Sequence, residues 1–576
     1  MKLLAYILIF TCSINLCHSS EKFITVFEQS KGTKTATYSQ VMDYYQSLAD
    51  NFEHVSIQSI GKTDSGKPLT LVTFNSDKYQ TFAEIRESKS ILLINNGIHP
   101  GESDGIDATM MLFRDLALGK ISIPKNLAIS TIPIYNIGGA LNRNSTTRIN
   151  QNGPLEYGFR GNARNYDLNR DFIKNDTENA KTFAQIFHLV KPDVFIDNHV
   201  SNGADYQYTL THLFTQHNKL GGQLGEYLNS SLMPALEMKL KIKDLDITPY
   251  VNVFNRVPET GFSQFMDYPR YSTGYTSLFN VIGMMVETHM LKPYKQRVEG
   301  TYELMVSMIE ILDTESDKIK ALRKDFYKKI YSQTKYTLDW EIDQDKSSSI
   351  DFKGYEGTMI DSKVTNAQRL IYDRSKPFSK PVKYQNHFKP SLQIATPEAY
   401  IIPQGWHNVI TQLKLNNVKM QQLTKDTIYQ VESYKIADYE SKKMPYEGHY
   451  LHSKTQITTS VATHKFKQGD YIINTNQPSI RYIIETLEPQ APDSFFNWNF
   501  FDTILQQKEG FSPYVFEEIA EEILKTNPEL KKDFKQKLKK DKEFNDSWYA
   551  QLDWIHKHSK YYEKAHKQYP VYRILK

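Results

Sequence analysis

The chain has 576 residues, a length that predicts about two to four domains and allows a large hydrophobic core. Hydrophobic residues make up 40% and charged residues 24%, which is the composition of an ordinary globular protein. The formal net charge of +4 is too small over this length to indicate a nucleic-acid surface, so we expect no nucleic-acid partner.

Residues 1–20 have the pattern of a secretory signal peptide. Lys2 precedes an apolar run at residues 3–16, and small residues follow at Ser19 and Ser20. The run is short for a membrane-spanning helix, and an uncleaved anchor is the less favoured interpretation. No later stretch is long and apolar enough to span a bilayer. We therefore expect a secreted or periplasmic protein without a membrane span.

Both cysteines of the chain, Cys12 and Cys17, lie inside this segment. Lipidation of Cys17 is not favoured, because Leu16 stands where a small residue usually precedes the modified cysteine. The mature chain would then have no thiol and no disulfide, so any metal would have to be held by His, Asp or Glu side chains.

Helical and strand patterns alternate through the first half of the chain. Residues 54–74 alternate around a polar turn and predict a hairpin. The other predicted elements are helices at 39–52, 104–118, 178–190, 219–230 and 294–312, and strands at 91–94, 127–135 and 194–197. This alternation predicts an α/β fold of three layers, α/β/α, with a mixed, largely parallel sheet. In such sheets, ligands gather at the carboxyl ends of the strands.

The second half of the chain has a different pattern. Runs containing Tyr, Thr and Val alternate with a period near two at residues 332–487 and predict antiparallel β structure, and from residue 495 onward the pattern is again helical. We therefore expect a signal peptide at 1–20, an α/β domain at 21–315, a β-rich accessory domain at 332–490 and a helical C-terminal region at 491–576.

His99 and Glu102 form a His-x-x-Glu pair directly after the predicted strand at 91–94. The pattern alone is weak, because His18 and Glu21 in the leader have the same spacing. Here, however, Pro and Gly separate the two residues between a strand and a helix, so a tight turn can bring the imidazole and the carboxylate to one side. The alternative is a surface turn with an exposed His and Glu.

His199 follows the predicted strand at 194–197, and Glu287 follows an apolar run at 281–286. A lone His there would more often be structural, but with His99 and Glu102 it completes the three-ligand set of a catalytic zinc, which leaves one position open for water. A buried carboxylate is costly unless it is partnered or protonated, and beside such a metal Glu287 can act as general base and then general acid. The alternative is a core Glu paired with a cation.

Asp167, Asn169 and Arg170 stand at the end of a long loop, residues 136–166, that we expect to be functional because of its length. Arg170 offers a planar fork that matches a carboxylate, and Asn169 can add a hydrogen bond beside it. Asp167 could accept the other ring N–H of a zinc-bound His and fix its tautomer. The alternative is a surface cluster of salt bridges.

With these motifs in order, residues 36–315 resemble the zinc carboxypeptidases, and residues 60–68 are similar to the N-terminal hairpin of that family. The resemblance implies one zinc ion per chain, held by His99, Glu102 and His199. It implies that Asn169 and Arg170 grip the free C-terminal carboxylate of a peptide substrate. Glu287 would be the base that activates the water for hydrolysis of the last peptide bond.

The resemblance implies two further catalytic residues. The family has an Arg ahead of the clamp that polarises the scissile carbonyl, and it has a mobile Tyr ahead of the catalytic Glu. For the Arg we favour Arg148 over Arg143 and Arg160, and for the Tyr we favour Tyr271 over Tyr268 and Tyr275. Arg270 is an additional cation at the predicted pocket wall, so the preference for the substrate side chain stays open.

Three other functions fit the same motifs. A zinc deacylase similar to aspartoacylase and succinylglutamate desuccinylase shares the His-x-x-Glu and Asp-Leu-Asn-Arg patterns, and a peptidase acting on peptidoglycan stem peptides would suit an exported enzyme. From another class, an inactive hydrolase could bind peptide or glycan through the β region. Four of the five tryptophans of the chain could form a carbohydrate platform, namely Trp406, Trp498, Trp548 and Trp554. Aromatic side chains at this density, however, are more often part of the core.

Overall fold

A computed structural model describes residues 23–77 and 80–575 of the chain. The signal peptide expected at residues 1–20, with Cys12 and Cys17, lies outside the described residues. Within the described part, no helix has the length and apolar character needed to cross a membrane.

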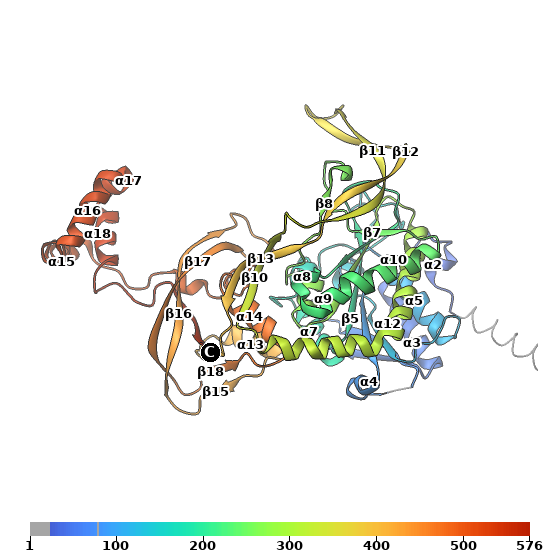
Figure 1. The fold of residues 1–576 in the computed structure, drawn as a ribbon, viewed down its shortest axis with the longest axis horizontal. Coiled ribbons are helices and arrows are strands. Elements are labelled where there is room, and N and C mark those ends of the chain that lie inside the picture. The colour runs from blue at the N-terminus through green and yellow to red at the C-terminus, as the bar shows by residue number, and fades with distance from the viewer. Residues whose placement is uncertain (1–22, 78–79, 576) are drawn as a thin grey trace, which may run out of the picture.

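The centre of the fold is an eight-stranded sheet in the order β1-β2-β4-β3-β5-β9-β6-β7 (Figure 1). Its strands are β1 (Val55–Ile60), β2 (Leu69–Phe74), β3 (Ser90–Asn95), β4 (Leu127–Ile132), β5 (Val194–Ser201), β6 (Leu210–Phe214), β7 (Ile247–Pro249) and β9 (Ile282–His289). The four central strands β4, β3, β5 and β9 run parallel, whereas β1–β2, β2–β4 and β6–β9 pair antiparallel. The predicted hairpin and the mixed, largely parallel sheet are therefore confirmed.

Helices cover both faces of this sheet, which confirms the predicted three layers. One face carries α3 (Tyr38–Asn51), α5 (Asp104–Ala117), α9 (Gly222–Tyr227), α10 (Met233–Ile242) and α12 (Tyr294–Ile330), and the other carries α4 (Phe82–Ser88), α7 (Glu178–Val190) and α11 (Ser272–Ser277). Side chains alternate between the two cores along each strand, as in β3, where Leu92 and Ile94 face α5 and Ile91 and Leu93 face α7. Burial on both faces explains why these strands are continuously apolar.

Short elements complete the α/β region. They are α2 (Val26–Gln29), α6 (Ile137–Leu141), α8 (His217–Leu220), β8 (Phe262–Ser263) and the single turns η1 (Leu168–Arg170), η2 (Leu228–Leu232) and η3 (Pro258–Thr260). The turn η1 lies in the Asp-Leu-Asn-Arg motif at the end of the long loop.

Residues after α12, together with β8, which pairs with β12, form three further sheets, and a helical bundle follows (Figure 1). The strands are β10 (Lys335–Ile342), β11 (Ser348–Asp361), β12 (Gln368–Gln385), β13 (Phe388–Ala395), β14 (Ala399–Ile402), β15 (Gln421–Gln422), β16 (Thr427–Ser441), β17 (His452–Phe466), β18 (Tyr471–Asn474) and β19 (Gln568–Ile574). The helices are α13 (His407–Leu415), α14 (Ile480–Leu487), η4 (Asp502–Leu505), α15 (Pro513–Thr526), α16 (Pro528–Lys540), α17 (Lys542–Asn545) and α18 (Trp548–Lys557). After the helical C-terminal region, β19 returns to the six-stranded sheet between β14 and β16.

The C-terminal half shares a hydrophobic core with the α7 face of the large sheet. One continuous cluster contains Phe187 and Tyr275 from the α/β region and Tyr482 and Trp498 from the C-terminal half. The rings of Phe279 and Tyr482 stack with their centroids 5.7 Å apart. This shared core fixes the C-terminal half against the turn that carries Asn169 and Arg170.

Candidate functional site

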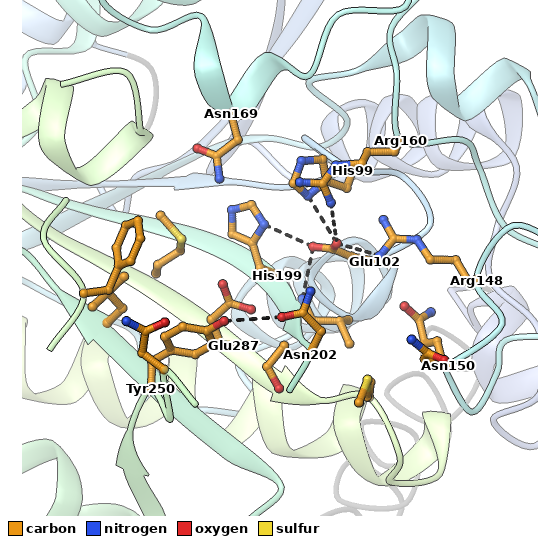
Figure 2. A pocket seen from close by; sticks show the side chains of 18 of the residues that line it. His99, Glu102, Arg148, Asn150, Arg160, Asn169, His199, Asn202, Tyr250 and Glu287 are labelled. Carbon is orange, nitrogen blue, oxygen red and sulfur yellow. Dashed lines mark hydrogen bonds and ion pairs between the residues drawn. The ribbon is translucent and has the colours of Figure 1, made fainter. Parts of the chain in front are cut away.

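Three side chains from two segments of the chain meet at the carboxyl ends of the parallel strands. His99 and Glu102 lie on the tight turn between β3 and α5, and His199 lies near the end of β5. Each residue offers one ligand atom, and these atoms all lie within 4.8 Å of one another. All three residues are buried. Figure 2 shows their side chains pointing toward one another.

Both imidazoles direct Nδ1 at the same carboxylate. His99 Nδ1 lies 3.2 Å from Oε1 of Glu102, and His199 Nδ1 lies 3.1 Å from Oε2. The opposite ring nitrogens each face another carboxylate, with His99 Nε2 2.9 Å from Asp167 Oδ1 and His199 Nε2 3.0 Å from Asp197 Oδ2. Each ring is therefore oriented from behind, and both Nδ1 atoms are left facing the centre.

Charges in this cluster depend on one another. Burial alone would raise the pKa of Glu102, but His99 and Arg148 hold it well below its usual range. Burial alone would lower the pKa of His199, but Asp197 and Glu102 raise it well above its usual value. Burial would likewise raise the pKa of Asp167, which His99 and Arg160 keep below its usual range. These pKa directions show that the cluster favours positive charge between its carboxylates.

The donor set fits a zinc ion. Two imidazole nitrogens and one carboxylate are the protein ligands that catalytic zinc takes in hydrolases. Within the described residues, His99 Nδ1 is buried without a hydrogen-bond partner, although its ring is held by Asp167. A buried nitrogen that faces a carboxylate and lacks a proton partner is suited to a cation.

Glu287 lies on β9 directly beside His199 on β5, since the two residues are register partners. Its side chain is half-buried and lines the same cavity as the His99 cluster. Burial raises the pKa of Glu287 to about 8, opposed by His199 and reinforced by Glu102. A carboxyl group with a pKa in this range can both accept and return a proton near neutral pH.

Two guanidinium groups flank Glu102. Arg148 Nη1 lies 2.7 Å from Glu102 Oε1, and Arg160 Nη1 lies 3.7 Å from the same oxygen. Arg160 also donates from Nε and Nη2 to Asp167 Oδ2, at 3.0 and 2.8 Å. Arg148 and Arg160 both line the cavity, whereas Arg143 donates to the carbonyl of Glu156 and does not.

Asn169 and Arg170 lie in the turn η1, and both line the cavity. The backbone N–H of Ser272 donates to Asn169 Oδ1 at 3.4 Å. Arg170 lies over the ring of Tyr271, 4.7 Å from its centroid. The turn therefore presents an amide and a guanidinium side by side.

The three candidate tyrosines have different surroundings. Tyr271 lines the cavity, and burial raises the pKa of its hydroxyl. Tyr268 donates to Asp339, and Tyr275 is in the core, where its hydroxyl donates to Asn416. The expected cation Arg270 does not line the cavity, because its Nη2 is bound to Asp493 Oδ1 at 2.8 Å.

The cavity has a volume of about 380 Å³ and includes residues that sequence reasoning did not single out. Tyr250 and Asn202 line it, and the Tyr250 hydroxyl donates to Asn202 Oδ1 at 3.5 Å. Asp197, behind His199, was also missed as a functional residue. Its position two residues before His199 in a strand placed both side chains on one face and was a usable signal.

Apolar side chains line the cavity beside Glu287. Met285 precedes Glu287 by two residues on β9 and so shares its face of the sheet, and Leu213 on β6 is its register partner. Phe265 lines the cavity as well and packs edge-on against Tyr271, with centroids 5.1 Å apart.

Comparisons with known proteins agree on one family. The family model described as zinc carboxypeptidase matches residues 41–192. Carboxypeptidase 2 of Trichophyton rubrum is 22% identical over 493 residues, covering 81% of this chain and 84% of its own length. Probable carboxypeptidase 2 of Arthroderma benhamiae is also 22% identical and covers 69% of this chain and 73% of its own length.

Solved structures similar to this chain include a metallo-carboxypeptidase from Burkholderia cenocepacia, with 14% identity and a TM-score of 0.36 over 48% of this chain and 70% of that one. Carboxypeptidase A from Helicoverpa armigera has 14% identity and a TM-score of 0.37, over 49% of this chain and 74% of that one.

Proposed function

The chain belongs to the zinc carboxypeptidase family, and from this premise we propose that it removes C-terminal residues from peptides that carry a free terminal carboxylate. It is a hydrolase of the metallocarboxypeptidase type. The observation that carries the proposal is the convergence of His99, Glu102 and His199 within 4.8 Å at the wall of a cavity that also holds Glu287.

We assign one zinc ion per chain to His99, Glu102 and His199. Bound there, zinc would act as a Lewis acid that polarises a carbonyl oxygen and makes water more acidic. Asp167 is hydrogen-bonded to His99 Nε2, and Asp197 Oδ2 lies 3.0 Å from His199 Nε2, so both carboxylates favour a proton on Nε2 and leave Nδ1 for the metal.

Glu287 is the proposed base. It faces the cavity beside His199, and its raised pKa lets it take a proton from water and later deliver it to the leaving amine. The carbonyl oxygen that gains charge would be stabilised by a guanidinium group beside Glu102, from Arg148 or from Arg160.

Asn169 and Arg170 are the proposed clamp for the terminal carboxylate. A guanidinium and an amide side by side can donate hydrogen bonds to both carboxylate oxygens, which would orient the last peptide bond toward Glu287. Tyr271 lies under Arg170 and is the tyrosine we propose to close over bound substrate.

The side chain of the last residue would enter the apolar part of the cavity. Met285 and Leu213 lie on the same face of the sheet as Glu287, and Phe265 adds an aromatic wall. The charged residues of the cavity are grouped at the metal cluster and the clamp. We therefore propose a preference for substrates that end in an apolar residue.

The signal-peptide pattern at residues 1–20 supports export of the enzyme.

A mixed peptide library tests this function. The purified, zinc-loaded protein is incubated with free and C-terminally amidated peptides, and the products are read by mass spectrometry. We expect loss of single apolar residues from free C-termini and no cleavage of amidated peptides. Release of acyl groups from N-acyl amino acids with intact peptides would instead support the deacylase alternative, and the absence of any turnover would contradict the proposal.

A further inference from the structure

A hairpin tip from the C-terminal half contacts Asp167, the residue whose carboxylate is hydrogen-bonded to His99. β16 and β17 are joined by residues 442–451, in which Tyr446 and His449 exchange backbone hydrogen bonds of 2.7 and 3.1 Å. The two residues between them, Glu447 and Gly448, have φ angles of +50° and +79°. Two positive φ angles in a two-residue loop are the geometry of a tight type I′ hairpin turn. The turn therefore fixes the backbone at Glu447.

Glu447 is hydrogen-bonded to the backbone of Asp167. The Asp167 N–H donates to Glu447 Oε2 at 2.8 Å, across 280 residues of sequence. Asp167 is the N-cap residue of η1, so the helical turn itself leaves this N–H without an acceptor. The carboxylate of the same Asp167 lies 2.9 Å from His99 Nε2. One short path thus leads from the C-terminal half to a proposed zinc ligand.

The rest of the tip is fixed on the same segment. At Gly448, an added Cβ would lie 2.6 Å from the Tyr166 hydroxyl oxygen, so the backbone of the tip packs directly on Tyr166. His449 Nε2 lies 2.7 Å from Asp176 Oδ2, which also binds the buried Lys174 at 2.6 Å. The tip therefore contacts residues on both sides of the clamp turn.

We propose that Glu447 is a positioning residue for the hydrolase, which holds the backbone of Asp167 and through it the ring of His99. The inference rests on the proposed function and adds to it a role for the C-terminal half in completing the active site. Glu447 has to supply a hydrogen-bond acceptor to the backbone N–H of Asp167. The side-chain oxygen of Gln can also accept this hydrogen bond.

The test compares Glu447→Ala with Glu447→Gln. The matched control is Glu440→Ala, which removes an exposed carboxylate of the same β16–β17 hairpin that pairs with Lys454 at 3.0 Å. Zinc affinity is measured by competition with a chromogenic chelator, and kcat/KM is measured on a peptide substrate. We expect Glu447→Ala to weaken zinc binding and kcat/KM by about 10- to 100-fold, as for other residues that orient metal ligands. Glu447→Gln and Glu440→Ala should stay within about threefold of the wild type.

A second variant, Gly448→Ala, perturbs the same contact from the backbone. Because it would strain a positive φ and crowd Tyr166, it should weaken zinc binding in the same direction. Equal losses in the Gln and Ala variants, or affinities in both Glu447→Ala and Gly448→Ala that match the control, would overturn the inference. If the wild type binds zinc but cleaves no peptide, the proposed function fails, while the zinc affinities still decide the role of Glu447.

Discussion

At the level of single residues, each histidine of the metal cluster is oriented by a carboxylate near its Nε2 atom. His99 is backed by Asp167 from the clamp turn, and His199 is backed by Asp197 from its own strand. The sequence indicated Asp167 because it is part of a recognisable motif. Asp197 was missed although its spacing from His199 in the strand was a usable signal. Glu447 was not found, because its significance depends on a contact that only the folded chain creates.

Replacement of Glu287 tests the chemistry separately from metal binding. Glu287→Gln keeps the shape of the side chain but cannot take up a proton, so we expect turnover to fall by about 10²- to 10⁴-fold with zinc content unchanged. Turnover is measured on a peptide with an apolar C-terminus, and zinc by atomic absorption. The control is Glu226→Gln on the exposed face of α9. Activity near that of the control would remove Glu287 from the mechanism.

Replacement of Arg170 tests the clamp. Arg170→Ala removes the guanidinium that we propose to bind the terminal carboxylate, so kcat/KM on free peptides should fall by about 10- to 100-fold. Any slow cleavage of amidated peptides should be unaffected, and Arg369→Ala on the exposed ribbon β12 serves as control. Equal losses on free and amidated peptides would show that Arg170 does not act on the carboxylate.

At the level of elements, the spacing of hydrophobic residues and the residue types found in turns predicted most of the α/β region. The hairpin at 54–74, the strand at 91–94 and the helix at 178–190 are present with small shifts of their ends. The helix predicted at 39–52 is α3 (Tyr38–Asn51), which Thr37 caps in a capping box with Gln40. The helix predicted at 294–312 continues to Ile330, since its charged second half stays helical.

Helix α7 carries a pH-dependent contribution to stability. Burial lowers the pKa of His188 to about 4, where its ring packs on Phe279 with centroids 4.8 Å apart. The unfolded chain, with an ordinary pKa near 6.5, binds this proton first as the pH falls. Stability from this residue is therefore complete above about pH 6.5 and is lost progressively toward pH 4.

The variant His188→Gln cannot titrate and should lose less stability than the wild type between pH 7 and pH 5, by about 1–2 kcal/mol. Thermal and urea midpoints of both proteins at the two pH values measure this difference. The exposed His407→Gln provides the comparison. If the midpoints of wild type and His188→Gln fall in parallel, His188 does not carry the effect.

At the level of the whole molecule, the boundary between the two halves is a packed core. Trp498 is fully buried in the cluster that also contains Tyr275, and Trp406 packs against the same cluster. Trp554 belongs to the helical bundle, and only Trp548 of the four is largely exposed, at 63%. The tryptophans therefore do not form one platform. Long-range packing of this kind has no local signature, which is why sequence patterns gave no role to the C-terminal half.

The bundle α15–α18 has a small core of its own, separate from the shared one. Replacement of residues 511–560 by a short Gly-Ser linker should therefore leave β19 in place, with a melting temperature within about 4 °C of the wild type. Zinc affinity and kcat/KM should be unchanged, because Glu447 and the cavity are untouched. Loss of either property would show that the bundle supports the active site.

Zinc loading would make the formal charge in the cleft more positive. The groups around the cavity comprise four carboxylates and three guanidiniums, namely Glu102, Asp167, Asp197, Glu287, Arg148, Arg160 and Arg170. Because the pKa of Glu287 is raised to about 8, this group carries little charge near neutral pH, so the seven groups sum to −3 + 3 = 0 and a divalent cation makes the sum +2. The loaded protein would then attract anionic peptide ends more strongly than the empty protein does, and the attraction would weaken with rising ionic strength.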